Sequence, residues 1–460
     1  MTEVTYGADA IALDIEGLKD DFQDCVGYIS SPLSDDGEEA LHSFKREDLD
    51  PNLVSSIIGK SLVEPKIMKA SYDSKSCSIY RVPYWLRKDN GEVYDPQFIS
   101  IGPFHYEKRE DKLRAMEEHK WRYLHDILSR KPRGWLEDCL ATVKGLEQKA
   151  RNCYSEVITT LDSNSFVEMM VLDGCFIVEL FRKSRLKDYD FIVRLEWVKK
   201  ALYYDLLLLE NQIPFFILQR LSILIDGEHP PFAESAFKFL MDDFTTVPGG
   251  RIRHLLDLQH ASYYIPFPNE HRDPSEIPRI PCASKLKEKG IRFRKRDADI
   301  LEIKFENGVI DIPNIEIWGK TKILFLNLIA LEQSIPRSQK PFTTHAFFMD
   351  CLIDTAKDVE ILCQEGIISN SLGNEELVAS LFNNMTREVV IFTYDFYLSD
   401  VFDKINQYSA RTWPKLRASL VHDYFNNPWA IISFFAALLL LLLTMTQTFF
   451  ASFPKFAFGK

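Results

Sequence analysis

The chain has 460 residues, of which 46% are hydrophobic and 27% are charged, proportions that are ordinary for a globular protein with a substantial core. Its net charge of −12 is concentrated near the start, because residues 1–50 hold fourteen acidic and three basic side chains. The remaining residues are therefore close to neutral. This excludes a general electrostatic attraction to nucleic acid, and we expect no nucleic-acid partner.

Residues 1–60 are acidic and contain the turn-forming sequences Ser-Ser-Pro at 30–32 and Ser-Asp-Asp-Gly-Glu-Glu at 34–39. This composition predicts an acidic, largely disordered arm with short helical pieces. The first residues lack the basic region and the long apolar stretch of a cleaved secretory signal, so none is expected. The eight cysteines form no Cys-x-x-Cys motif, and we interpret them as free thiols packed in the core rather than as bridges or metal ligands.

A large helical domain is predicted over residues 75–425. Its opening, residues 86–105, contains Asn-Gly and Gly-Pro pairs and is expected to be extended and rich in turns. Apolar residues then recur at helical spacing, Ser165 and Glu168 predict a capping box, and Pro214 is expected to break or restart a helix. The segments with a helical pattern are 108–130, 135–157, 166–182, 190–225, 322–331, 342–364, 374–383 and 387–408.

A small β-hairpin insertion is predicted near residues 291–317. The runs 300–305 and 309–312 have the alternation of strands and are joined across Asn307-Gly308, a pair favoured in tight two-residue turns. The predicted fold class is therefore mainly α, with a large helical domain, this hairpin, a disordered N-terminal arm and one C-terminal transmembrane helix.

The transmembrane helix is predicted over residues 429–450. No charged side chain occurs between Asp423 and Lys455, and a helix of these 22 residues spans about 33 Å, enough for the hydrocarbon core of a bilayer. The alternatives are a buried core helix and a cleaved lipid-anchor signal. Residues 451–460 would form a short tail. The residues that mark the membrane anchor are Trp429, Leu438, Leu443 and Phe450.

This anchor predicts a single-pass membrane protein that contacts the lipid bilayer through its C-terminal helix. Because the anchor leaves the ribosome last, residues 1–428 are expected to stay in the cytosol. A span of 22 residues favours the plasma membrane over the thinner endoplasmic reticulum, which is the alternative. If the body faced the lumen or the cell exterior, the sequon Asn384-Met385-Thr386 would be available for glycosylation.

The common catalytic and cofactor motifs do not occur in the sequence. Residues 59–61 and 319–321 read Gly-Lys-Ser and Gly-Lys-Thr, but Val54 and Asn314 stand where a phosphate loop needs glycine. The nearest histidine pairs are six residues apart, which does not match the i,i+4 spacing of a helical zinc site. A Gly-x-Ser-x-Gly nucleophile motif is absent. We therefore assign no catalytic residue, no metal site and no cofactor.

A candidate polar network is formed by seven polar side chains, several of which interrupt apolar runs. Buried carboxylates are costly unless they are paired or hydrogen-bonded. Two of them could form an active dyad with a raised pKa, or the set could cap backbone groups at helix ends and bends. The network consists of Asp173, Glu179, Glu210, Asn211, Gln212, Asp257 and Glu332.

A candidate basic patch is the strongest electrostatic feature of the body. Its three arginines alternate with other residues, so a strand would place them on one face. The patch could contact anionic lipid headgroups or the acidic N-terminal arm, or it could be a solvated strand edge that discourages edge pairing. It consists of Lys285, Lys287, Lys289, Arg292, Arg294 and Arg296.

Several sequence blocks occur in an order that is typical of one plant family. They include Ile79-Tyr80-Arg81-Val82-Pro83, Ile99-Ser100-Ile101-Gly102-Pro103-Phe104-His105, Met116-Glu117-x-His119-Lys120, Met169-Met170-Val171-Leu172-Asp173-Gly174-Cys175-Phe176, Asp205 to Phe215, His254-Leu255-Leu256-Asp257 and Asn327 to Gln333. Over about residues 75–450 the chain resembles the plant domain of unknown function 247 family, UPF0481-type plant membrane proteins. The resemblance implies no established enzymatic activity and no catalytic residues. Some grass members are associated with self-recognition between pollen and stigma, which implies a recognition role.

Together these features predict a membrane-anchored, non-catalytic interaction or recognition protein that presents an exposed face to a protein partner. The alternative is an enzyme of unrecognised, hydrolase-like type that uses buried carboxylates such as Asp173, Glu210 or Asp257. A mainly structural scaffold is a third possibility. The sequence identifies neither the partner nor the oligomeric state.

Overall fold

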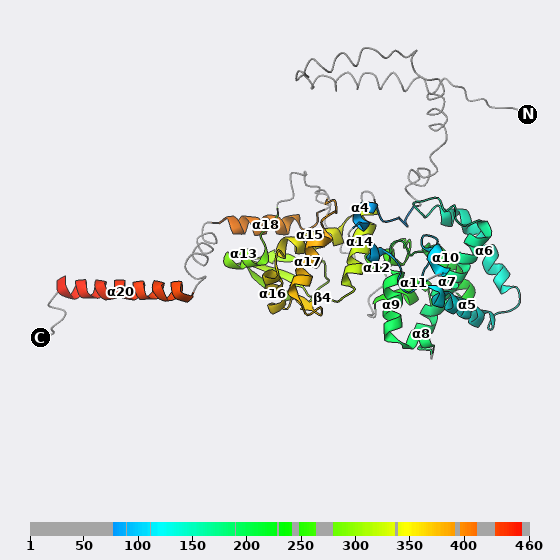
Figure 1. Cartoon of the computed structure of the whole chain (residues 1–460), viewed down its shortest axis with the longest axis horizontal. Helices are drawn as coiled ribbons and strands as arrows, with labels where there is room; N and C mark the ends of the chain where they lie inside the picture. The colour runs from blue at the N-terminus through cyan, green and yellow to red at the C-terminus, as the bar shows by residue number, and fades with distance from the viewer. Residues whose placement is uncertain are drawn as a thin grey trace, which may run out of the picture. The chain divides into compact units, whose positions relative to one another are not determined.

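The computed structural model describes residues 77–88, 90–110, 112–188, 190–227, 230–241, 248–263, 279–335, 339–391, 396–411 and 428–452. The predicted acidic arm at 1–60 and residues 453–460 of the predicted tail lie outside this part of the chain. Within it the chain is mainly helical with two small sheets, which confirms the predicted mainly α class (Figure 1).

Helix α7 (Ser163–Leu186) is the centre of the first group of helices. All its residues from Phe166 to Phe181 are buried except Glu168, and a helix that is apolar on every side must be covered on every side. Helices α5, α6, α10 and α11 provide that cover. This group comprises α4 (Tyr84–Arg87), η4 (Gly91–Tyr94), η5 (Tyr106–Glu110), α5 (Arg114–Leu128), α6 (Trp135–Arg151), α8 (Phe191–Arg194), α9 (Glu196–Leu206), α10 (Phe215–Asp226), α11 (Phe232–Met241) and α12 (Leu255–Ser262).

The start of α7 differs from the predicted capping box. Asp162 is the N-cap, and its side chain accepts a hydrogen bond of 2.7 Å from the backbone N–H of Ser165, which lies inside the helix. The predicted restart at Pro214 is correct, because Pro214 precedes the first residue of α10. Helix α6 ends before the predicted 157, since Ile79 and Tyr154 form an isolated parallel bridge.

The predicted hairpin is present at its predicted turn. Strands β2 (Lys304–Glu306) and β3 (Val309–Pro313) pair antiparallel across Asn307 and Gly308, which have the positive φ angles of 51° and 77° that a tight hairpin turn requires. The first strand is shorter than predicted, because the N–H of Glu302 donates to the carbonyl of Asp299 in a turn.

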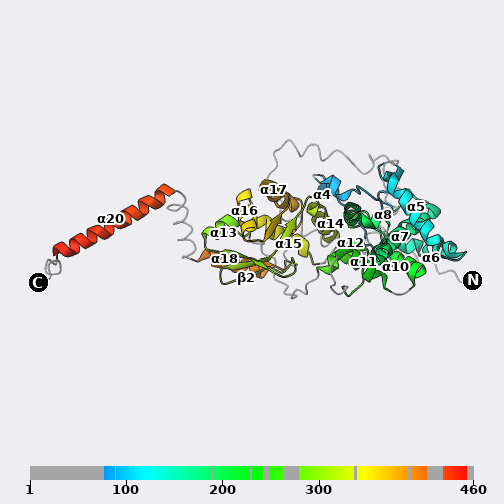
Figure 2. The ribbon, with the colours of Figure 1, turned by 90° about the horizontal axis from the view of Figure 1, so that it is seen from below.

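Strand β1 (Arg292–Arg296) pairs parallel with the other side of β3, so the hairpin belongs to a three-stranded sheet in the order β1-β3-β2. Figure 2 shows α18 (Ser399–Ala410) beside β2, and the two elements are in contact. A second sheet, formed by β4 (Ile315–Ile317) and β5 (Ile368–Asn370) in parallel, was not predicted. Its strands are three residues each, too short for a strand pattern in the sequence.

The remaining helices form the second group. The predicted helix over 342–364 is two helices, because the chain leaves the helical path at Ile353 and Thr355 caps the next one. The predicted helix over 387–408 is wrong at residues 387–391 and 396–398, which are not helical, and correct over α18; residues 392–395 lie outside the described residues. The group comprises α13 (Ala283–Glu288), α14 (Thr321–Ser334), α15 (Pro341–Leu352), α16 (Ala356–Gln364), α17 (Glu375–Met385) and α18.

Helix α14 joins the two groups. It packs against η4 of the first group and against α15 and α17 of the second. Its buried Asn327 donates from Nδ2 to the carbonyl of Val93 at 2.9 Å, and its Oδ1 accepts from the N–H of Leu209 at 2.9 Å. One amide therefore fixes η4 and the segment after α9 to α14.

Helix α20 (Pro428–Ser452) covers the predicted anchor and is long and apolar enough to cross a membrane. Leu438 and Leu443 are exposed along it. Trp429 and Phe450 lie within the helix, and their side chains are outside the described residues. Such an apolar, uncovered helix matches the pattern of a membrane span rather than that of a core helix.

Candidate functional site

The irregular segment 95–105 is largely buried between helices, so its backbone polar groups need partners other than water. The carboxylate of Asp205, in the last turn of α9, accepts hydrogen bonds from the N–H groups of residues 97, 98 and 99 at 2.6–3.2 Å. Asn211 accepts from the N–H of Ile101 at 2.6 Å and donates to the carbonyl of Ile99 at 3.0 Å. These side chains therefore form the hydrogen bonds with the backbone that a neighbouring β-strand would otherwise form.

Asp173 on α7 is the centre of a fully buried charge cluster. Arg109 binds it through two nitrogens at 2.6 and 3.1 Å, Lys120 donates to it at 2.8 Å, and the N–H of Gly102 donates to it at 2.8 Å. Burial alone would raise the pKa of the Asp173 carboxyl, but the two cations outweigh burial and lower it. Lys120 also contacts Glu117 at 2.6 Å. The carboxylate is thus ionised and saturated with donors.

Glu210 forms a second cluster with residues near the start of the described part of the chain. Arg87 lies 2.8 Å and Arg81 3.2 Å from its oxygens, and the N–H of Val82 donates to it at 2.8 Å. The buried His105 lies 3.2 Å away. Burial opposes ionisation, but His105 and Arg87 prevail and lower the pKa of Glu210 to about 2. Glu210 and His105 therefore meet in the interior of the protein, where Glu210 is 1% exposed.

The other members of the candidate polar network lie apart from these clusters. Glu179 is paired with Arg130 at 2.8 Å. Asp257, in the first turn of α12, accepts from Arg253 at 2.5 Å. The Oε1 and Oε2 atoms of Glu332 accept from the first N–H groups of α15 at 2.9 and 2.8 Å, and His260 Nε2 lies 2.8 Å from Oε1.

Gln212 completes the set, and its amide holds the turn between α9 and α10. Its Nε2 donates to the carbonyls of Leu206 and Leu208, both at 2.7 Å. The seven residues therefore form several separate structural contacts, each with backbone groups or cations, and none of them lines the three cavities described below.

The candidate basic patch lies on α13 and β1, with Lys289 at the end of α13. Its three arginines share one face of β1, as alternation predicts, but two of them have acidic partners. Arg294 binds Asp311 at 2.5 and 2.6 Å, and Arg296 lies 3.0 Å from Glu302. These ion pairs reduce the positive potential of the patch.

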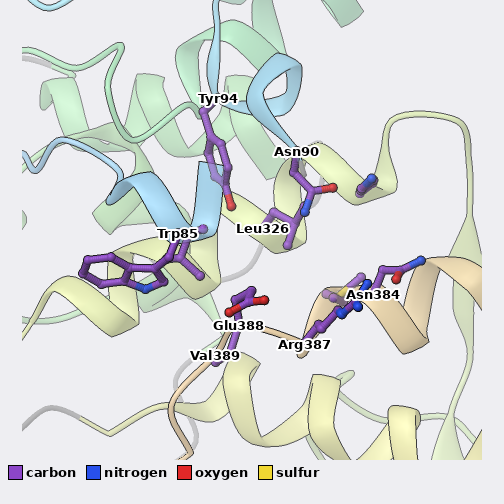
Figure 3. Close-up of a pocket in the computed structure, with 11 residues that line it drawn as sticks. Trp85, Asn90, Tyr94, Leu326, Asn384, Arg387, Glu388 and Val389 are labelled. Carbon is purple, nitrogen blue, oxygen red and sulfur yellow. The ribbon is translucent and has the colours of Figure 1, made fainter. Parts of the chain in front are cut away.

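The first cavity, of about 250 Å³, is lined from three distant parts of the chain: the start of the body, α14 and the end of α17 (Figure 3). The ring of Tyr94 extends from η4 toward the cavity, with Glu388 and Arg387 opposite. Lys322, Asn90 and the exposed Trp85 add polar and aromatic surface. This mixture of charges can hold a small polar group but favours no single ligand chemistry.

The second cavity is an apolar groove of about 550 Å³ between α5, α6 and α7. Its lining is mainly apolar and includes Trp121 and Leu140, which are 50% and 36% exposed. The polar side chains Lys144, Asn164 and Glu168 also line it. Lys144 contacts the hydroxyl of Ser163, which places the middle of α6 beside the start of α7 and gathers these polar groups at one end of the groove.

The third cavity, of about 350 Å³, lies between the end of α6, the first turns of α10 and residues 251–253. Its lining carries three cations and no carboxylate. The lining residues are Ser78, Lys149, Cys153, Phe216, Gln219, Arg251, Ile252 and Arg253.

Sequence reasoning missed the residues that neutralise or replace the predicted carboxylates, above all Arg109, Lys120 and Asp205. Asp205 carries the same signal as Asp173, a carboxylate within an apolar run, and could have been found by it. Arg109 and Lys120 carry no such signal, because cations on a helix are usually solvated. Among the described residues, no group of three or more His, Cys, Asp or Glu is arranged to hold a metal ion, and the seven described cysteines are free thiols.

Two plant proteins and one family model match most of this chain. The chain is 32% identical over 425 residues to the UPF0481 protein At3g47200 of Arabidopsis thaliana, covering 84% of this chain and 88% of the relative. It is 22% identical over 513 aligned positions to the putative UPF0481 protein At3g02645 of the same plant, covering 87% and 96%. No solved structure matches it significantly. The model of the plant protein family of unknown function DUF247 matches residues 79–443, and the chain belongs to that family.

Proposed function

We propose that this protein is a membrane-tethered, non-catalytic interaction protein that binds an amphipathic helix of a partner protein in the groove between α5, α6 and α7. The observation that supports this function is the exposed apolar groove itself. Exposed apolar surface that is concave and contiguous is uncommon on monomeric proteins and marks binding sites. Helix-in-groove recognition uses such a surface for the apolar face of the incoming helix.

The charge at the polar end of the groove specifies the partner further. Lys144 is engaged by Glu147 at 3.1 Å, so its charge is already compensated. Glu168 is exposed and has no ion pair among the described residues. A basic residue beside the apolar face of the partner helix would complement it. The expected occupant is therefore an amphipathic helix that carries Lys or Arg at one end of its apolar face.

The state of the buried carboxylates supports a non-catalytic role. Asp173 and Glu210 are each saturated by cations and backbone N–H groups, and the seven residues of the candidate polar network stay clear of the three cavities. A hydrolase-like mechanism needs a carboxylate that can reach a substrate. These groups instead fix loops in place.

A photo-crosslinker placed in the groove tests the proposal. Trp121→p-benzoylphenylalanine in the full chain, in its native membranes, is expected to crosslink to a peptide that forms an amphipathic helix with a basic residue. Leu140→Asp should abolish the crosslink, because it places a charge in the apolar lining. Since Leu140 is partly exposed, the melting temperature of the variant should stay close to that of the wild type.

The matched control is the crosslinker at Trp197, an exposed tryptophan on α9 outside the groove. It should not capture the same peptide. Crosslinks at position 121 only to lipid or to a second copy of this chain would overturn the proposal. So would a partner peptide whose capture is unaffected by Leu140→Asp.

The proposal places the helical domain on the cytosolic face of the plasma membrane, with α20 as the tether. A tether raises the local concentration of the groove near other membrane components. The side of the membrane on which the helical domain lies is tested by protease protection of an N-terminal tag in sealed microsomes, where digestion of the tag is expected. Asn384 is exposed and provides a second readout, because a lumenal or extracellular domain would gain a glycan removable by glycosidase. A protected tag with a glycan would contradict the cytosolic placement.

A further inference from the structure

We propose that the cavity between α6, α10 and residues 251–253 binds a phosphate monoester. This proposal is independent of the apolar groove, with which the cavity shares no lining residue.

The first support is the sign of the charge. Lys149, Arg251 and Arg253 line the cavity, and no aspartate or glutamate lines it. A cleft lined by charges of one sign concentrates its potential, so it attracts counter-ions more strongly than the same charges on an open surface. A phosphate monoester carries nearly two negative charges at neutral pH, which suits several cations better than a carboxylate does.

The second support is that two of these cations have no acidic partner among the described residues. Arg253 binds Asp257 at 2.5 Å, which compensates its charge. Lys149 and Arg251 are exposed and form no ion pair with any residue that the structure describes. The arginines of the basic patch on β1 differ in this respect, because Arg294 and Arg296 are paired with carboxylates. The charges of Lys149 and Arg251 are therefore available to an anion in the cavity.

The third support is the arrangement of the neutral groups. The Lys149 ammonium lies 4.3 Å from the centre of the Phe216 ring, a cation–π contact that holds it over the cavity. Gln219, which has an amide donor, and the buried Ser78 also line the cavity. Guanidinium groups bind phosphate oxygens in pairs, so Arg251 would provide a two-point contact.

The phosphate could belong to a lipid headgroup or to a soluble molecule, and the experiment separates the two. The full chain is reconstituted in phosphatidylcholine nanodiscs, and inorganic phosphate is titrated by calorimetry at constant ionic strength. Saturable binding is expected. Lys149→Gln combined with Arg251→Gln should weaken it by at least about tenfold, because charge-assisted contacts are lost. Both residues are exposed, so the melting temperature should not change.

The matched control is Lys285→Gln combined with Arg292→Gln, which removes the same charge from the basic patch and should alter binding by less than about twofold. A second arm adds phosphatidic acid, whose headgroup is a phosphate monoester, to the nanodiscs. If phosphatidic acid competes with inorganic phosphate in the wild type but not in the Lys149→Gln, Arg251→Gln variant, the site binds a lipid headgroup. If phosphatidic acid does not compete, the site binds a soluble monoester. Absence of saturable binding, or an equal loss in both double variants, would overturn the proposal.

Discussion

Two ion pairs with the same chemistry show how differently the two helical groups use charge. Arg109 binds Asp173 through two nitrogens in the first group, and Arg294 of β1 binds Asp311 of β3 in the same way, in the sheet that contacts α18 of the second group. The side chains of Arg109 and Asp173 are 7% and 0% exposed, whereas that of Arg294 is 67% exposed. Water can replace Asp311 as a partner of Arg294, but it cannot reach Arg109. The buried pair is therefore structural, and the exposed pair contributes little.

In the second group, helix α18 packs through aromatic contacts. Phe402 of α18 lies against the rings of Phe347 and Phe396, with centroids 5.9 and 4.9 Å apart. Phe348 packs edge-on against the same ring at 5.9 Å. The first group needs buried charges because it encloses the irregular segment 95–105, whose backbone groups would otherwise lack partners.

The largest effect is expected from Asp173→Asn. It leaves the buried cations Arg109 and Lys120 to share Glu117 as a counter-charge, so one positive charge is uncompensated. This costs about 3–5 kcal/mol in the free energy of unfolding. Denaturant unfolding of the full chain in detergent, followed by tryptophan fluorescence, measures it. Adding Lys120→Met should recover part of the loss, because one uncompensated charge is removed. A stability equal to the wild type would show that water reaches the cluster and would break the contrast with Arg294.

The next effect is a pH dependence at Asp205. Burial raises the pKa of Asp205 to about 6, despite the N–H donors from residues 97–99. The unfolded carboxyl ionises near its ordinary pKa of 3.8, so it loses its proton first as the pH rises. The contribution of Asp205 to the free energy of unfolding is therefore fully present below pH 4. It decreases by about 3 kcal/mol as the pH rises through 6.

Asp205→Asn cannot titrate, so the stability of this variant relative to the wild type should increase between pH 4 and pH 7. Unfolding free energies of both proteins at several pH values measure the difference. A difference that is constant across this range would show that Asp205 has an ordinary pKa.

A smaller effect distinguishes two glycines with positive φ. Gly102 has a φ of 73°, and a Cβ there would lie 2.5 Å from the carbonyl oxygen of Gln212. Gly366 in the second group has a φ of 71°, but its Cβ would meet only Lys295 at 3.6 Å. Gly366→Ala should therefore cost only the left-handed strain, about 1–2 kcal/mol, and Gly102→Ala should cost more. Equal losses in melting temperature would contradict tight packing around residues 95–105.

The smallest effect is expected from Arg294→Gln. Its ion pair with Asp311 is exposed, so the loss is screened by solvent and the melting temperature should stay within experimental error. Thermal unfolding at low and high salt measures this. A clear destabilisation that disappears at high salt would show that surface charge supports the sheet after all.

The sequence alone determined the features that depend on neighbours along the chain. Helical periodicity predicted the mainly α class, Asn307-Gly308 located the hairpin turn, Pro214 marked the start of α10, and the apolar run at 429–450 coincides with α20. These signals are local, because hydrogen bonds in helices and tight turns join residues a few positions apart. Boundaries set by packing, such as the break between α15 and α16, were not predicted.

Only the tertiary structure decided what the predicted polar residues do. Asp173 meets Lys120 across 53 positions and Arg109 across 64, and Glu210 accepts from Val82 across 128. No spacing in the sequence encodes such partners, because the chain between them must fold before they meet. The cationic cavity has the same origin: Lys149 and Arg251 belong to separate segments. Its chemistry exists only where α6, α10 and residues 251–253 pack together.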